Sequence, residues 1–161
     1  MHEPADQPSS AQDARRADHD RTLTAMLALE AALEAAAPGR EPTWRADVLE
    51  ALAVLDEATR DEQRNASSPD SLLSDIKRTQ PRLRTRVRGL RSQYAQLREA
   101  IVAISAELTE RDDDANDYAD IRQRLSWILT ALRHQRALES DLLYEAYFDA
   151  FRSDLSTETT R

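Results

Sequence analysis

The chain has 161 residues, no cysteine and a formal net charge of −8 at pH 7. The lack of cysteine excludes disulfides, zinc–thiolate sites, iron–sulfur clusters and thiol nucleophiles, and the acidic balance argues against general nucleic-acid binding. With two glycines and 5% aromatic residues, the composition is typical of long amphipathic helices in a single domain. The N-terminus lacks the pattern of a signal peptide, and no apolar run is long enough to span a membrane, so we expect a cytoplasmic protein.

The first helix follows a polar segment. Residues 1–9 include two prolines and several polar side chains, which predicts a disordered tail. Ser10, with Asp13 three residues later, indicates a helix N-cap, and Pro38 followed by glycine indicates the end of the helix. Residues at spacings of three and four form the expected buried seam of this helix: His19, Leu23, Met26, Glu30 and Leu33.

The second helix should begin near Pro42, because proline is tolerated in a first turn, and should end near Asn65. The segment NASSPDSLL then predicts a loop, in which Ser68 or Asp70 caps a short helix that ends before Pro81. We expect this short helix to cover one end of the molecule. The seam of the second helix comprises Trp44, Val48, Leu52, Leu55, Thr59 and Glu62.

The third and fourth helices carry the longest patterns. The third has a seam at spacings of four and three throughout: Leu83, Val87, Leu90, Tyr94, Leu97, Ile101, Ile104 and Leu108. The fourth begins after an acidic loop, ends near Leu155 before a tail at 156–161 that we expect to be disordered, and has the seam Tyr118, Ile121, Leu125, Ile128, Leu132, Gln135, Glu139, Leu142 and Ala146.

These elements predict an all-α fold. Four amphipathic helices with mostly short connections favour an up-down-up-down antiparallel four-helix bundle over residues 10–155, with a short extra helix between helices two and three. In that topology, the starts of helices one and three meet the ends of helices two and four. The polar seam residues gather at this end, and they form a candidate core cluster of His19, Glu62, Tyr94, Gln135 and Glu139, with His134 one residue off the seam.

Three segments resemble one known family. PDSLLSDI after helix two, PRLRTRVRGLRSQYAQL in helix three and HQRALESDLLYEAY in helix four are similar to the bacterial hemerythrin-like (HHE) cation-binding proteins. The resemblance covers the stretch from about Arg40 to Phe148. It implies a four-helix bundle in which histidines and carboxylates on the inward faces hold a pair of irons, and it places His19 at the family's first-helix histidine.

The resemblance also implies that most iron ligands are substituted. Glu62 stands where helix two would supply a histidine, and Tyr94 stands at the histidine of the third helix, whereas His134 and Glu139 keep a spacing similar to the family's. Neither His19 nor His134 has a glutamate three residues before it, which a ferritin-like di-iron site requires. At most a single iron or other divalent metal remains as an alternative, with ligands from His19, Glu62, His134 and Glu139, or with Tyr94 among them.

We therefore expect a non-catalytic hemerythrin-like bundle that has lost its di-iron site. In this interpretation the protein holds no cofactor, the polar cluster is a hydrogen-bonded plug, and the chain acts as a binding or scaffold protein for an unidentified protein partner or a second copy. The alternative is a metal- or small-ligand-binding protein, of a redox or gas-sensing kind, that uses the reduced mixed site. No serine, histidine and acid are placed as a catalytic triad.

Three other patterns have plain explanations. A run without acidic residues, Lys77 to Arg91, indicates an anion-binding patch or a solvated basic face, and the acidic chain favours the second. Residues 112–123 resemble a calcium loop but lack its central glycine and final glutamate. An aromatic stripe at helical spacing favours core or end-cap packing over a dimer surface: Tyr144, Tyr147, Phe148 and Phe151.

Overall fold

The structure is a computed structural model, and it describes residues 7–35, 38–110 and 118–158. Within these ranges the fold is all-helical, as predicted, and contains no strand. None of the described helices combines the length and the apolar character that crossing a membrane requires. The elements are α1 (Gln7–Glu34), α2 (Glu41–Ala66), α3 (Leu72–Thr79), the 3₁₀ turn η1 (Pro81–Leu83), α4 (Arg84–Glu110) and α5 (Tyr118–Glu158).

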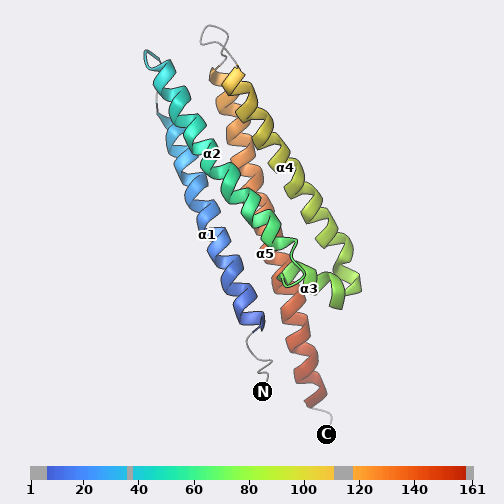
Figure 1. The fold of residues 1–161 in the computed structure, drawn as a ribbon. Coiled ribbons are helices and arrows are strands. Elements are labelled where there is room, and N and C mark those ends of the chain that lie inside the picture. The colour runs from blue at the N-terminus through green and yellow to red at the C-terminus, as the bar shows by residue number, and fades with distance from the viewer. Residues whose placement is uncertain (1–6, 36–37, 111–117, 159–161) are drawn as a thin grey trace.

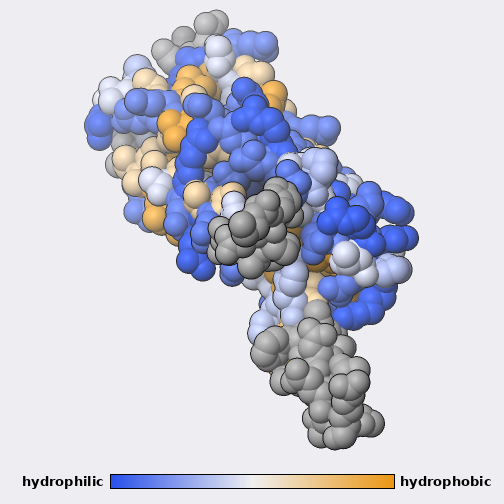
Figure 2. Space-filling view, turned by 60° about the horizontal axis from the view of Figure 1, so that its bottom comes forward, coloured by the Kyte–Doolittle hydropathy of each residue, from blue (hydrophilic) through white to orange (hydrophobic). Residues whose placement is uncertain are grey.

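The four long helices lie side by side, and each runs opposite to the one before it in the chain (Figure 1). α1 packs on α2, α2 on α4, and α4 on α5, while α5 also contacts α1. The short α3 lies where α2 ends and α4 begins, and it contacts all four long helices at that end. Hydrophilic side chains cover most of the surface visible when this end is turned forward (Figure 2).

The core includes most apolar residues of the seams predicted for α2, α4 and α5, together with residues of α1. Because the large apolar residues recur every three or four positions, they fall on one face of each helix and pack against the facing helices. Leu52, Ile101 and Leu125 are fully buried in the larger cluster, which all four long helices build. Leu73 and Ile76 of α3 bury themselves in a second cluster against α4 and α5. The short helix therefore closes the core at its own end.

The seam predicted for α1 is partly wrong. Leu23 is 37% exposed, and Glu30 lies near the surface, where it accepts a hydrogen bond from Arg133. The buried face is turned from the predicted one toward smaller residues, because alanine and threonine let α1 approach its neighbours closely. Besides His19, it comprises Thr22, Ala25, Met26, Leu29 and Leu33.

Two predicted helix starts are also wrong. α1 begins at Gln7, so Ser10 lies inside the helix and does not cap it, and only residues 1–6 of the predicted tail fall outside the described residues. The N-cap of α3 is Ser71, neither Ser68 nor Asp70. Its Oγ accepts a hydrogen bond from the backbone N–H of Ser74 at 3.2 Å, which satisfies one of the free donors of the first turn.

The helix ends agree with the prediction more closely. α2 ends at Ala66, next to the predicted Asn65. Between α1 and α2, Gly39 has a φ of 76°, in the left-handed region that favours glycine. α5 continues to Glu158, so residues 156–158, which were expected to be disordered, are helical.

Two neighbouring residues of α4 test this account of the core. Ile101 is fully buried and Val102 is 50% exposed. Ile101→Ala should lower the free energy of unfolding by about 2–5 kcal/mol, because it removes buried methyl groups and leaves a cavity. Val102→Ala should stay within about 0.5 kcal/mol of the parent. Urea denaturation of both variants measures the difference, and similar losses would contradict the observed face of α4.

Candidate functional site

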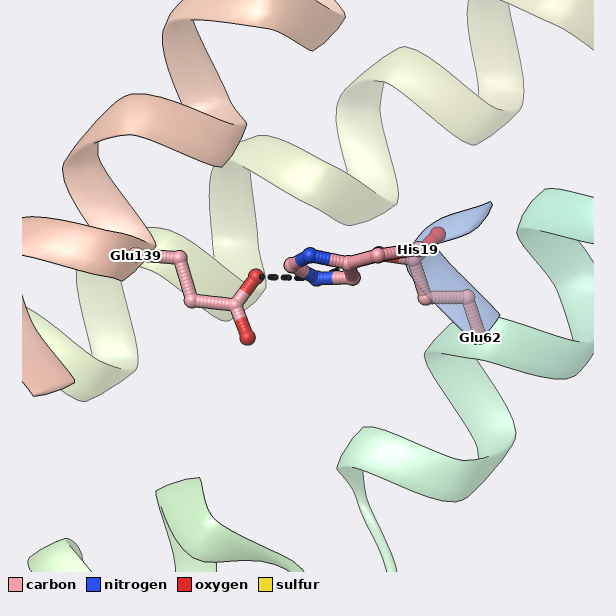
Figure 3. A group of neighbouring side chains, drawn as sticks. All are labelled: His19, Glu62 and Glu139. Atoms are coloured by element: carbon pink, nitrogen blue, oxygen red, sulfur yellow. Dashed lines mark hydrogen bonds and ion pairs between the residues drawn. The ribbon is translucent and has the colours of Figure 1, made fainter. Parts of the chain in front are cut away.

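Three helices bring one imidazole and two carboxylates together. Nε2 of His19, on α1, lies 3.2 Å from Oε1 of Glu62, on α2, and 3.2 Å from Oε2 of Glu139, on α5. One ligand atom from each residue lies within 4.8 Å of the other two. Figure 3 shows the ring of His19 directed toward Glu139, with the side chain of Glu62 beside it. We call these three residues the His–Glu–Glu cluster.

The helix patterns explain why these residues meet. Glu62 follows Thr59 by three positions in the seam of α2, and Glu139 follows Gln135 by four positions in the seam of α5. Glu62 therefore extends the apolar seam of α2 by one turn, and Glu139 lies in the seam of α5 between Gln135 and the buried Leu142. The helices alternate in direction, so the end of α2 and the middle of α5 lie beside the first half of α1, and α5 runs on past them.

Two further side chains hold the carboxylates. Nε of Arg15 donates a hydrogen bond to Oε1 of Glu139 at 3.0 Å, and Oγ1 of Thr22 donates one to Oε2 of Glu62. Each carboxylate thus contacts His19 with one oxygen and a second donor with the other. Arg15 lies four residues before His19 and Thr22 three after it, a helical spacing that could have indicated both residues from the sequence.

Burial and charge act against each other in the cluster. His19 is 7% exposed. Burial alone would lower the pKa of His19, but the carboxylates of Glu139 and Glu62 outweigh this effect and raise that pKa above 6.5. Burial would likewise raise the pKa of Glu139, but His19 and Arg15 hold it below its ordinary value. When His19 carries its proton, His19 and Arg15 match the two carboxylates in formal charge.

Tyr94 and Gln135 also face this region, but they bond to backbone groups. The Tyr94 hydroxyl donates to the carbonyl of Thr59 at 3.3 Å, and Nε2 of Gln135 donates to the carbonyl of Leu90 at 2.6 Å. The hydroxyl of Tyr94 therefore donates to a main-chain acceptor of the seam residue Thr59. Burial, followed by the charge of Glu62, raises the pKa of Tyr94 well above its ordinary range, so the hydroxyl stays protonated.

His134 does not belong to the cluster. Its side chain is exposed, whereas the adjacent Gln135 is 6% exposed. Successive residues of an α-helix point about 100° apart, so only one of the two faces the interior. The apolar seam of α5 passes through Gln135, and this register turns His134 toward the surface.

A cleft with a volume of about 750 Å³ opens beside the cluster. Its walls come from the start of α1, the end of α2, α3 with the loop before it, α4 and α5. His19, Glu62 and Glu139 line it together with Tyr94 and Gln135. The sequence did not indicate this cleft, because its shape depends on where α3 and the start of α1 lie.

The geometry fits one metal ion better than two. Two ligand atoms bound at about 2.0–2.2 Å to the same ion lie roughly 3.0–3.5 Å apart. Both 3.2 Å separations at Nε2 of His19 fall in that range. A di-iron centre draws ligands from four helices. The described residues supply one histidine and two carboxylates from three helices, so they do not fit such a centre.

The other sequence patterns serve local roles. In the basic run, Arg78 pairs with Asp75, and Arg82 and Arg86 both pair with Glu145. In the aromatic stripe, Tyr147 donates a hydrogen bond to Asp75, whereas Tyr144 and Phe148 are exposed and stacked with centroids 5.0 Å apart. The side chain of Phe151 and residues 112–117 of the calcium-like segment lie outside the described residues.

The chain was compared with known proteins in three ways. A scan against protein-family models finds no match, and comparisons with curated proteins and with solved structures find none either.

Raising the pH should weaken the fold through His19. It faces Glu62 of α2, Glu139 of α5, Arg15 of its own helix and Tyr94 of α4. Its folded-state pKa is raised, so its proton stabilises the fold fully below pH 6.5, and this contribution is lost as the pH rises through the folded-state pKa. In chelator, the urea midpoint should therefore fall more steeply with rising pH for the parent than for His19→Gln. Parallel curves would contradict the charged network.

The Tyr94 hydroxyl should contribute little to stability. Its bond to the Thr59 carbonyl is 3.3 Å long, and that carbonyl belongs to the helix α2, so losing it strands no side-chain partner. Tyr94→Phe should cost at most about 1 kcal/mol in urea denaturation. A loss of about 2 kcal/mol or more would mean that the hydroxyl bonds a cluster carboxylate in solution.

Proposed function

We propose that the chain is a non-catalytic, antiparallel four-helix bundle that binds a single divalent metal ion through the His–Glu–Glu cluster. The alternation of four long helices and the place of His19 on α1 are compatible with the resemblance to hemerythrin-like proteins, which no family model matches. The ligand set supports one ion in place of the pair of irons that the resemblance implies.

The observation that carries this proposal is the convergence of the three ligand atoms at the wall of an open cleft. Their contacts at 3.2 Å have the separation that a shared ion imposes, and they come from three different helices. The carboxylate side chains of Glu62 and Glu139 remain 13% and 15% exposed, so an ion reaches them from the cleft.

The charge of the cluster suits a divalent ion. Binding requires a neutral imidazole, so the ion takes the place of the proton that His19 carries between the two carboxylates. Two carboxylates then balance the two positive charges of the ion. One nitrogen and two oxygen donors favour Zn²⁺, Fe²⁺ or Mn²⁺ over soft ions such as Cu⁺. Three protein ligands leave coordination positions open toward the cleft.

A second candidate is a purely structural network in a scaffold or binding protein. Both oxygens of each carboxylate already have partners in Arg15, His19 and Thr22, which favours this reading. The two candidates differ in one respect that is measured directly, because a structural network gains nothing from a metal ion.

Metal titration separates the two candidates. Chelator-treated protein should bind one Zn²⁺, Mn²⁺ or Co²⁺ per chain in calorimetry. A hundredfold excess of metal over the dissociation constant should stabilise the fold by about 2.7 kcal/mol. His19→Gln and Glu139→Gln should abolish this stabilisation, because each removes a ligand.

The matched control is His134→Gln. His134 lies on α5, as Glu139 does, but its side chain is exposed and does not belong to the cluster. This variant should bind metal as the parent does. A flat thermal-shift profile across all three metals would leave the structural network as the function of the cluster. Two irons per chain after growth with iron would contradict both candidates.

A further inference from the structure

One positively charged side chain in the wall of the cleft forms no ion pair with any described carboxylate. This side chain is Arg91, on α4. Nη2 of Arg91 donates to the Ala66 carbonyl and to Oγ of Ser74, each at 2.9 Å, and its buried Nε has no hydrogen-bond partner among the described residues. These partners are neutral, so they fix the guanidinium in place without balancing its charge. Because Nε is buried and Nη2 already makes two hydrogen bonds, Nη1 is the nitrogen left to bind a ligand.

Three acidic residues of the cleft wall either bond to groups other than Arg91 or are exposed to solvent. Asp75 accepts hydrogen bonds from Arg78 and Tyr147, and Asp18 accepts from the Asn65 amide. Asp70 is exposed. None of these carboxylates forms an ion pair with Arg91 in the described part of the chain.

Metal binding would add a second positively charged group, besides Arg91, to the same cleft. An ion on the two carboxylates neutralises the charge of Glu139, which balances Arg15 in the metal-free network. The metal-loaded cleft then has Arg15 beside the ion and Arg91 in the wall, with open coordination positions between the ion and the cavity. Its volume of about 750 Å³ is of the size that encloses small organic ligands.

We propose that the metal-loaded cleft binds a small dicarboxylate, with one carboxylate on the metal ion and the other on Arg91. This inference rests on the metal site proposed above. A carboxylate is the group that both a hard divalent ion and a planar guanidinium bind well. Two separate positive points favour an anion with two ends over one with a single charged centre, and Gln135 keeps Oε1 as an acceptor for a ligand hydroxyl.

The test uses Co²⁺-loaded full-length protein, because the visible absorption of Co²⁺ reports a change in its ligands. Succinate, acetate and inorganic phosphate are titrated separately, and calorimetry measures each affinity. Succinate should bind at least about tenfold more tightly than acetate and than phosphate, a difference of about 1.4 kcal/mol. Phosphate matches the charge of a dicarboxylate but has one centre, so equal affinities for succinate and phosphate would overturn the two-point binding.

Variants of α4 assign the second carboxylate. Arg91→Gln should reduce the advantage of succinate over acetate to less than about threefold. Arg91→Lys keeps the charge and should retain part of that advantage, which separates lost binding from a folding defect. Arg88→Gln, an exposed neighbour outside the cleft, should behave as the parent does.

The outcomes distinguish this inference from the proposed function. If no Co²⁺ binds, the metal site itself is wrong, and the inference falls with it. If Co²⁺ binds with the expected spectrum but succinate is no better than acetate, only the dicarboxylate inference is wrong. The same holds if the advantage of succinate survives in Arg91→Gln.

Discussion

One imidazole nitrogen, Nε2 of His19, lies between two carboxylates at the end of the molecule that α3 covers, and it joins side chains of three helices. The partly buried charges of the cluster lose favourable hydration, and only mutual attraction and good hydrogen bonds offset that loss. Arg15 and Thr22 supply those bonds to the outer carboxylate oxygens. The contacts tie α1 to α2 and to α5, although few other contacts join α1 and α5.

Packing of the apolar core brings the side chains of the His–Glu–Glu cluster to the same height along the bundle. Between the connecting loops at one end and the cluster at the other, the long helices bury one continuous apolar cluster, in which leucines and isoleucines predominate. Such packing is dense, so sliding one helix past another would open cavities or force overlaps. The register is therefore fixed where the side chains are apolar, and the polar residues one turn further along meet as a consequence. The smaller cluster beneath α3 closes the core beyond them.

The sequence was most informative where large apolar residues repeat. The faces of α2, α4 and α5, and with them Glu62, Gln135 and Glu139, follow from a spacing of three and four. The face of α1 did not, because its buried side includes Ala25 and Thr22, whose small side chains give a weak signal. The cleft could not be predicted from the sequence for another reason. Its shape is set by the path of α3 and the loop before it, and no periodic pattern encodes that path.

The fold itself does not require the His–Glu–Glu cluster. Apolar side chains in place of a buried ion network are often as stabilising or more so, since they avoid the loss of hydration. A leucine at each of the three positions would add to the apolar seams of α1, α2 and α5. The charged groups instead border a cleft, partly exposed, beside a guanidinium that no described carboxylate neutralises. A network whose only role was to join helices would gain nothing from this opening, and a binding site needs it.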